Sequence, residues 1–96
     1  MRRMTQPSPP YREYCATSFE DAAVLRVCGL HAIDTRANGG RVSVVFEDTD
    51  ASAADLLARH ARGDLEVKSS DLLDSYQWAK STVFNARRRL GLERGR

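Results

Sequence analysis

The densest group of basic side chains lies at the end of this sequence. Residues 80–96 hold six Lys or Arg and a single acid, Glu93. Residues 11–62 have a different balance, with six Arg against eight Asp or Glu. A phosphate backbone responds to the local density of Lys and Arg more than to net charge, which is only +2 for the whole chain. This asymmetry indicates a nucleic acid as the partner.

The basic residues fall on a segment with the pattern of an amphipathic helix. Six residues recur at intervals of four and three, which places them on one packed stripe. They are Leu72, Tyr76, Ala79, Val83, Ala86 and Leu90. At about 100° per residue, five further side chains fall between about 160° and 260° from this stripe, on the opposite face. They are Trp78, Ser81, Asn85, Arg88 and Arg89.

This opposite face has the mixture of side chains that contacts nucleic acids. An outward Trp78 can stack on a base, Asn85 can hydrogen-bond a base edge, and the guanidinium groups neutralise phosphate. Four more cations extend the basic surface: Lys80, Arg87, Arg94 and Arg96. Two other interpretations stay open. The face is a solvated one with Trp78 filling a crevice of the same domain, or it binds a protein partner with Trp78 as the anchor.

No other group of side chains predicts an enzyme. The acids of residues 47–50, with Asp34 on the adjacent strand, could hold Mg²⁺. The same stretch also suits the end of a strand followed by a helix cap, and we favour this second interpretation. The two histidines have no ligand partners nearby in the sequence, and we expect His60 at the core or its boundary. Cys15 and Cys28 are expected as reduced, buried thiols, although their positions permit a disulfide. The sequence therefore predicts no metal, no cofactor and no catalytic residue.

Local patterns predict the elements that would position the basic helix. Alternation of Val42, Val44 and Phe46 with their neighbours is the period of a half-buried strand. The Asn-Gly-Gly sequence within residues 37–40 favours positive φ and predicts the turn of an antiparallel hairpin. A capping box predicts Thr17 as the N-cap of the first helix. Strands are expected at residues 12–17, 30–35 and 41–47, and helices at residues 19–28, 52–62 and 69–91.

The order of these elements is βαββαα. It predicts an α+β fold, with a three-stranded, mainly antiparallel sheet and the helices packed on one face. Residues 1–10 are expected as a disordered arm because of their prolines, residues 11–92 as a single domain and residues 93–96 as a basic tail. The second helix opens at a capping pattern that begins with Ser52. No apolar run suits a membrane span or a signal peptide, so we expect a cytoplasmic protein.

Four segments share a pattern with other sequences: residues 14–25, 28–30, 40–49 and 62–67. They describe a strand that ends in Thr, a helix rich in Ala and Leu, a Gly, and a strand that ends in Phe-Glu-Asp. Over residues 14–90 this pattern resembles a small family of unknown function found in bacteria and their phages. The resemblance implies a phage or mobile-element setting, and it implies no catalytic residues.

A second resemblance covers only residues 79–92. Their sequence, Ala-Lys-Ser-Thr-Val-Phe-Asn-Ala-Arg-Arg-Arg-Leu-Gly-Leu, is similar to the recognition helix of helix-turn-helix modules in phage primases and replication proteins. The turn Gly that usually precedes this helix is absent, and Gln77 and Trp78 stand in its place. The unbroken stripe favours one long helix, with a break near Gln77 as the alternative.

Two hypotheses follow for function. The first is a small nucleic-acid-binding accessory protein, encoded by a phage or mobile element, that contacts phosphates and bases through its basic C-terminal helix. The second is an adaptor, an inhibitor or a subunit of a larger assembly that binds protein and no nucleic acid. Such a partner would dock on the same helix face or on the sheet surface of Arg41, Ser43 and Val45. The sequence leaves DNA or RNA, sequence preference and oligomeric state open.

Overall fold

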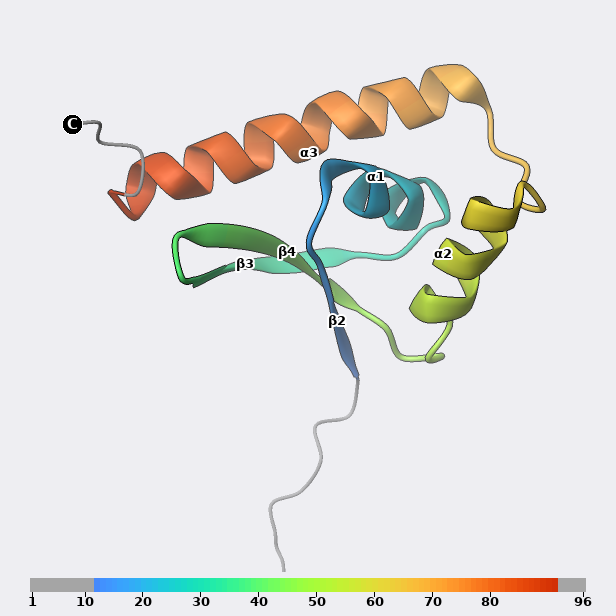
Figure 1. Cartoon of the computed structure of the whole chain (residues 1–96), viewed down its shortest axis with the longest axis horizontal. Coiled ribbons are helices and arrows are strands. Elements are labelled where there is room, and N and C mark those ends of the chain that lie inside the picture. The colour runs from blue at the N-terminus through green and yellow to red at the C-terminus, as the bar shows by residue number, and fades with distance from the viewer. Residues whose placement is uncertain (1–11, 92–96) are drawn as a thin grey trace, which may run out of the picture.

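The computed structural model describes residues 12–91 (Figure 1). Its strands are β2 (Glu13–Ala16), β3 (Ala32–Asn38) and β4 (Arg41–Glu47), and its helices are α1 (Phe19–Val27), α2 (Ala53–Arg62) and α3 (Ser69–Arg89). The sheet is antiparallel with the strand order β2-β4-β3. The predicted α+β fold in the order βαββαα is therefore confirmed. The arm and the basic tail expected at the two ends lie outside the described residues.

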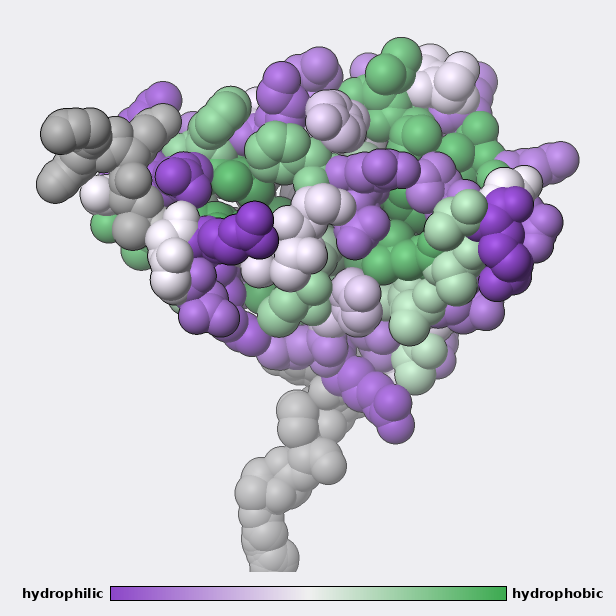
Figure 2. All heavy atoms as spheres, in the orientation of Figure 1, coloured by the Kyte–Doolittle hydropathy of each residue, from purple (hydrophilic) through white to green (hydrophobic). Residues whose placement is uncertain are grey.

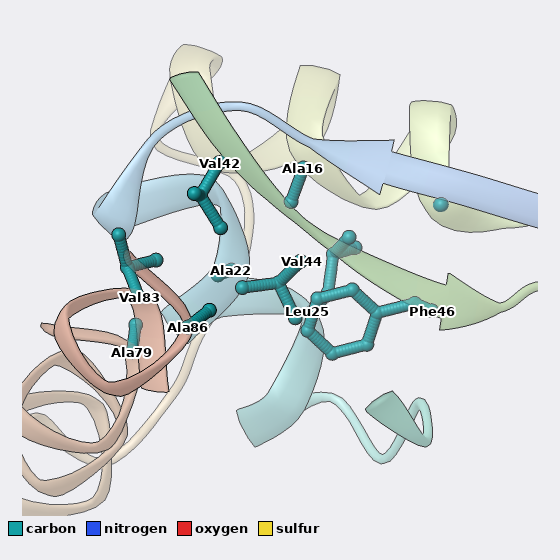
Figure 3. Close-up of a cluster of buried hydrophobic side chains, with 10 residues drawn as sticks. Ala16, Ala22, Leu25, Val42, Val44, Phe46, Ala79, Val83 and Ala86 are labelled. Atoms are coloured by element: carbon teal, nitrogen blue, oxygen red, sulfur yellow. The ribbon is translucent and has the colours of Figure 1, made fainter. Parts of the chain in front are cut away.

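Strand β4 is the centre of the sheet and supplies much of the core. Val44 and Phe46 are almost completely buried, and Val42 is 9 % exposed. As their alternation predicts, these three side chains share the face that packs against α1 and α3 (Figure 3). Burial of side chains of this size contributes about 1.5–3 kcal/mol each, so this one strand anchors both helices to the sheet.

A two-residue turn at Gly39 and Gly40 joins β3 to β4. Both glycines have positive φ, 62° and 85°, and Asn38 pairs directly with Arg41. Positive φ at two successive positions is the geometry of the tight hairpin turns, which glycine adopts without strain. The turn is shorter than the four residues expected, so β3 extends to Asn38, and a bulge near the start of β3 shifts its register.

Val45 is fully buried on the face of the sheet opposite α1 and α3. Arg36 of β3 reaches to β2 on this face, where Nη2 donates to Glu13 Oε1 at 3.2 Å and Nη1 lies 3.8 Å from Cys15 Sγ. Since β4 lies between β2 and β3, the Arg36 side chain must cross β4 to reach Glu13. The hydrogen bond with Glu13 raises the pKa of Arg36, which stays charged. At this point β4 is buried on both faces, unlike the half-buried strand that was predicted.

The N-cap of α1 is Ser18, so the prediction of Thr17 is wrong. The Ser18 hydroxyl accepts the backbone N–H of Asp21 at 3.0 Å. Glu20, which would complete the predicted capping box, instead lies 2.7 Å from His60 Nε2 of α2. His60 is half-buried, as expected for a residue at the core boundary. The contact of His60 with Glu20 links α1 to α2 across their exposed edge.

Helix α2 begins with Ser52 at the N-cap position, as the sequence predicts, but the side chain that caps it is Asp48. Asp48 is 8 % exposed, and its Oδ1 accepts the backbone N–H groups of Ser52 at 2.8 Å and Ala53 at 3.0 Å. The Ser52 side chain makes no capping hydrogen bond. A carboxylate near the start of a helix is favourable because the free N–H groups there carry partial positive charge. The favoured interpretation of residues 47–50 as a cap is therefore confirmed for Asp48.

Helix α3 runs without a break through Gln77, in agreement with the single long helix that was predicted. Its packed face, however, is rotated from the predicted stripe, since Tyr76 and Leu90 are 37 % and 50 % exposed. The buried residues are Ser75, Ala79, Val83 and Ala86. Arg26 of α1 donates to the Ser75 hydroxyl at 3.1 Å, which satisfies a polar group that the sequence places outside the core.

The two cysteines are free thiols in different surroundings. Cys15 is exposed, so its predicted burial is wrong, because it lies on the sheet face that carries no helix. Cys28 is only half-buried at the end of α1. Burial raises the pKa of the Cys28 thiol, and the positive charge of Arg59 offsets part of this effect. No disulfide joins the two cysteines in this structure, and their reduced state stays a prediction.

Candidate nucleic-acid interface

The contact residues predicted on α3 differ in their exposure. Four of them are exposed: Ser81, Asn85, Arg88 and Arg89. Three are half-buried: Trp78, Lys80 and Arg87. Arg94 and Arg96 lie outside the described residues. The outer face of α3 is therefore polar and basic, but its composition differs from the one predicted.

Trp78 does not face the solvent, so its predicted place on the outer face is wrong. Its ring meets Phe46 edge-on, with 6.3 Å between the centroids, and the Arg26 guanidinium lies 4.7 Å from the Trp78 centroid. The rotation of α3 that buries Ser75 also brings Trp78 to the flank of the core. A guanidinium at this distance makes a cation–π contact, which occupies one face of the ring. Trp78 is therefore a packing residue.

Phe84 is the most exposed aromatic residue of α3. Its side chain is 44 % exposed, and an edge contact with Phe19, 6.5 Å between centroids, fixes its ring. Lys80 precedes Phe84 by four residues and Arg88 follows it by four, so the three side chains lie along one face. Sequence reasoning missed Phe84, although the signal was present, since Phe84 falls about 120° from the apolar stripe.

Arg87 and Arg89 hold the end of α3 against the β3–β4 hairpin. Arg87 Nη1 donates to the carbonyl oxygen of Gly40 at 3.1 Å, and Arg89 Nη2 donates to Thr35 Oγ1 at 3.3 Å. A guanidinium has five N–H donors, so both side chains keep donors for a further partner. These two contacts fix the orientation of the basic end of the helix relative to the sheet.

The charge along α3 is strongly divided. Residues 75–91 carry four basic side chains and no acid, whereas Asp71 and Asp74 stand near the start of the helix. Cations in the last turn stabilise a helix by about 0.3–1 kcal/mol each, which explains part of this pattern without any ligand. Stabilisation of the last turn does not account for Lys80, which lies more than two turns from the end of α3, or for the exposed Phe84. Figure 2 shows hydrophilic and hydrophobic residues side by side along α3.

Comparison with known proteins gives no relative: no family model, no curated protein and no solved structure matches this chain. Between residues 12 and 91, no helix has the length and apolar character needed to cross a membrane. The same residues contain no group of His, Cys, Asp and Glu arranged to hold a metal ion. The candidate interface is therefore defined by its own geometry and charge.

Proposed function

We propose that this protein binds single-stranded nucleic acid through the outer face of α3. The observation that carries the proposal is the exposed ring of Phe84, placed one turn from Lys80 and one turn from Arg88. An aromatic ring beside cations supplies base stacking and phosphate neutralisation together, which is the combination that holds single strands. A duplex offers no free base face to the ring, so the exposed Phe84 favours a single strand.

Each side chain of this face has a defined role in the proposal. Phe84 stacks on a base, while Lys80 and Arg88 neutralise the phosphates on either side of it. Ser81 and Asn85, both exposed, supply hydrogen bonds to base edges or sugars. The two arginines anchored to the hairpin orient this face. Binding of this kind suits an accessory protein without catalysis or cofactor, and its phage or mobile-element setting rests on the sequence resemblance alone.

Fluorescence anisotropy with labelled oligo(dT) and oligo(U) tests the proposal and separates DNA from RNA. Wild-type protein should bind at about 50 mM salt and lose affinity steeply toward about 200 mM, because binding releases counterions. Phe84→Ala should lower the affinity roughly 5- to 150-fold, which corresponds to about 1–3 kcal/mol of stacking. Lys80→Ala combined with Arg88→Ala should reduce the slope of log affinity against log salt by about 1.4, or about 0.7 for each phosphate contact.

Matched variants separate this face from general charge and from folding. Leu73→Ala removes another exposed apolar side chain of α3, and Arg12→Ala with Arg59→Ala removes two exposed cations elsewhere. Both controls should bind nearly as wild type does. The proposal is wrong if wild-type protein binds neither oligonucleotide at about 50 mM salt. It is also wrong if the controls lose as much affinity as the variants of the face, and the adaptor hypothesis then becomes the better one.

A further inference from the structure

The first half of β4 has one open side. Strand β3 pairs with β4 as far as the hairpin turn, but β2 pairs only with residues 44–47. The chain leaves the sheet after Ala16 in order to begin α1 at Phe19. Beside residues 41–43 the sheet therefore has a gap about 10 Å long, at about 3.4 Å per residue.

The directions of hydrogen bonds show which backbone groups face this gap. Asp48 N–H bonds to the Arg12 carbonyl on the β2 side at 2.7 Å, and Glu47 N–H bonds to the His31 carbonyl on the β3 side at 2.8 Å. These directions alternate along an antiparallel strand, so the N–H and C=O of Val42 point to the β2 side, beyond the end of β2. Neither group has a hydrogen-bond partner among residues 12–91.

Arg87 already satisfies the neighbouring group on the same edge. In a trans peptide the Gly40 C=O points away from the Arg41 N–H, which faces β3, and Arg87 donates to that oxygen at 3.1 Å. Shielded backbone polar groups are nearly always paired, and an unpaired one costs about 1–3 kcal/mol. Val42 is only 9 % exposed, and a partner that covers this edge must therefore supply hydrogen bonds to its N–H and C=O.

An apolar groove adjoins the gap on the core face of the sheet, to which the Val42 side chain points. The groove has a volume of about 380 Å³. Its apolar walls come from β2, α1, β4 and α3: Ala16, Phe19, Val42, Val44, Tyr76 and Val83. The polar residues Thr17, Ser18 and Glu20 complete the lining. In Figure 2 hydrophobic surface is visible between α3 and the β3–β4 hairpin. The gap therefore combines unpaired backbone groups with space for an apolar side chain.

We propose that this gap binds an extended segment of a partner protein, which pairs with Val42 as an added short strand. An extended backbone supplies one donor and one acceptor at strand spacing, which a lipid or a nucleobase does not. The residue opposite Val42 would point into the apolar groove, and its two neighbours would point to the other face of the sheet. Arg41 is exposed on that face, so the neighbours of complementary charge are acidic. The partner segment thus has the order acidic, apolar, acidic.

Amide hydrogen exchange followed by NMR tests the open edge. In the free protein the Val42 N–H should exchange at least about tenfold faster than that of Val44, which pairs with Ala16. Saturation with the end-blocked peptide Glu-Val-Glu-Val-Glu should slow exchange at Val42 at least about tenfold. Protection of Val42 equal to that of Val44 in the free protein would overturn the proposal, because the chain itself or a second copy would then fill the gap.

Two control peptides and one variant test the nature of the occupant. The peptides Lys-Val-Lys-Val-Lys and Glu-Ser-Glu-Ser-Glu should each bind at least about tenfold more weakly, because the first reverses the charge and the second removes the apolar side chain. Arg41→Glu, at an exposed position, should reverse the charge preference. Equal binding of all three peptides, or oligo(dT) replacing the peptide at Val42, would overturn the proposal. Arg88→Ala should leave peptide binding unchanged, which distinguishes this surface from the nucleic-acid face of α3.

Discussion

Replacement of Trp78 by Ala should destabilise the domain strongly, although the sequence places this residue on the outer face. The ring packs against Phe46 and lies 4.7 Å from the Arg26 guanidinium. Removal of a fully buried Trp costs about 3–5 kcal/mol, and a half-buried ring should lose about half of that. With about 0.5–1 kcal/mol for the cation–π contact, we expect a total loss of about 2–3.5 kcal/mol.

Thermal and urea unfolding followed by far-UV circular dichroism measure this loss. At about 4–8 °C per kcal/mol for a domain of this size, the melting temperature should fall by about 8–28 °C. Phe84→Ala is the matched control, since it truncates an exposed ring and should cost less than about 1 kcal/mol. A double-mutant cycle of Trp78→Ala with Arg26→Ala should give a coupling of about 0.5–1 kcal/mol. If Trp78→Ala melts within about 2 °C of wild type, the ring is not packed, and the outward orientation expected from the sequence is right.

Three further experiments test the rest of the fold. Val44→Asp should unfold the domain because an unpaired charge in the core costs several kcal/mol, whereas Ser43→Asp should be tolerated; equal melting temperatures would reject the register of β4. Asp48→Ala should lose about 1–2 kcal/mol in urea unfolding, because the start of α2 loses its acceptor, and Asp48→Asn should lose less; identical stabilities would exclude the capping role. Cys15 should react with a maleimide faster than Cys28 at neutral pH, since Cys15 is exposed and burial raises the pKa of Cys28. Mass spectrometry that found the reverse order would contradict this assignment.

The parts of the fold that depend on neighbours in the sequence are predictable. The alternation of β4 and the paired glycines at 39 and 40 predict the central strand and the hairpin, because both patterns act over a few residues. The prediction of Thr17 as the cap of α1 is wrong because the cap depends on a residue that is distant in the sequence. Glu20, which would close the capping box at Thr17, binds His60 of another helix. Similarly, the Arg36 side chain crosses β4 to bond with Glu13, a contact between β3 and β2 that the alternation of β4 does not predict.

The orientation of α3 decides the candidate site, and its own sequence does not determine it. The predicted stripe and the observed packed face of α3 share Ala79, Val83 and Ala86, but only the observed face includes Ser75. Ser75 becomes buried because Arg26 of α1 supplies its hydrogen bond, and this contact spans 49 residues of sequence. The resulting rotation places Trp78 against the core and leaves Phe84 as the most exposed aromatic residue of α3. The basic residues are less affected, because Arg87, Arg88 and Arg89 follow one another in the last turn and point to different sides of the helix.

Ultraviolet cross-linking of the wild-type protein to a single-stranded oligonucleotide tests the proposed role of α3 most directly. Trypsin cleaves after Lys80 and Arg87, so Phe84 lies in the peptide of residues 81–87 and Trp78 in the peptide of residues 69–80. We predict that the mass of the attached nucleotide appears on the peptide of residues 81–87. Attachment at Trp78, attachment to a part of the chain outside α3, or no attachment at low salt would contradict binding through the outer face of α3.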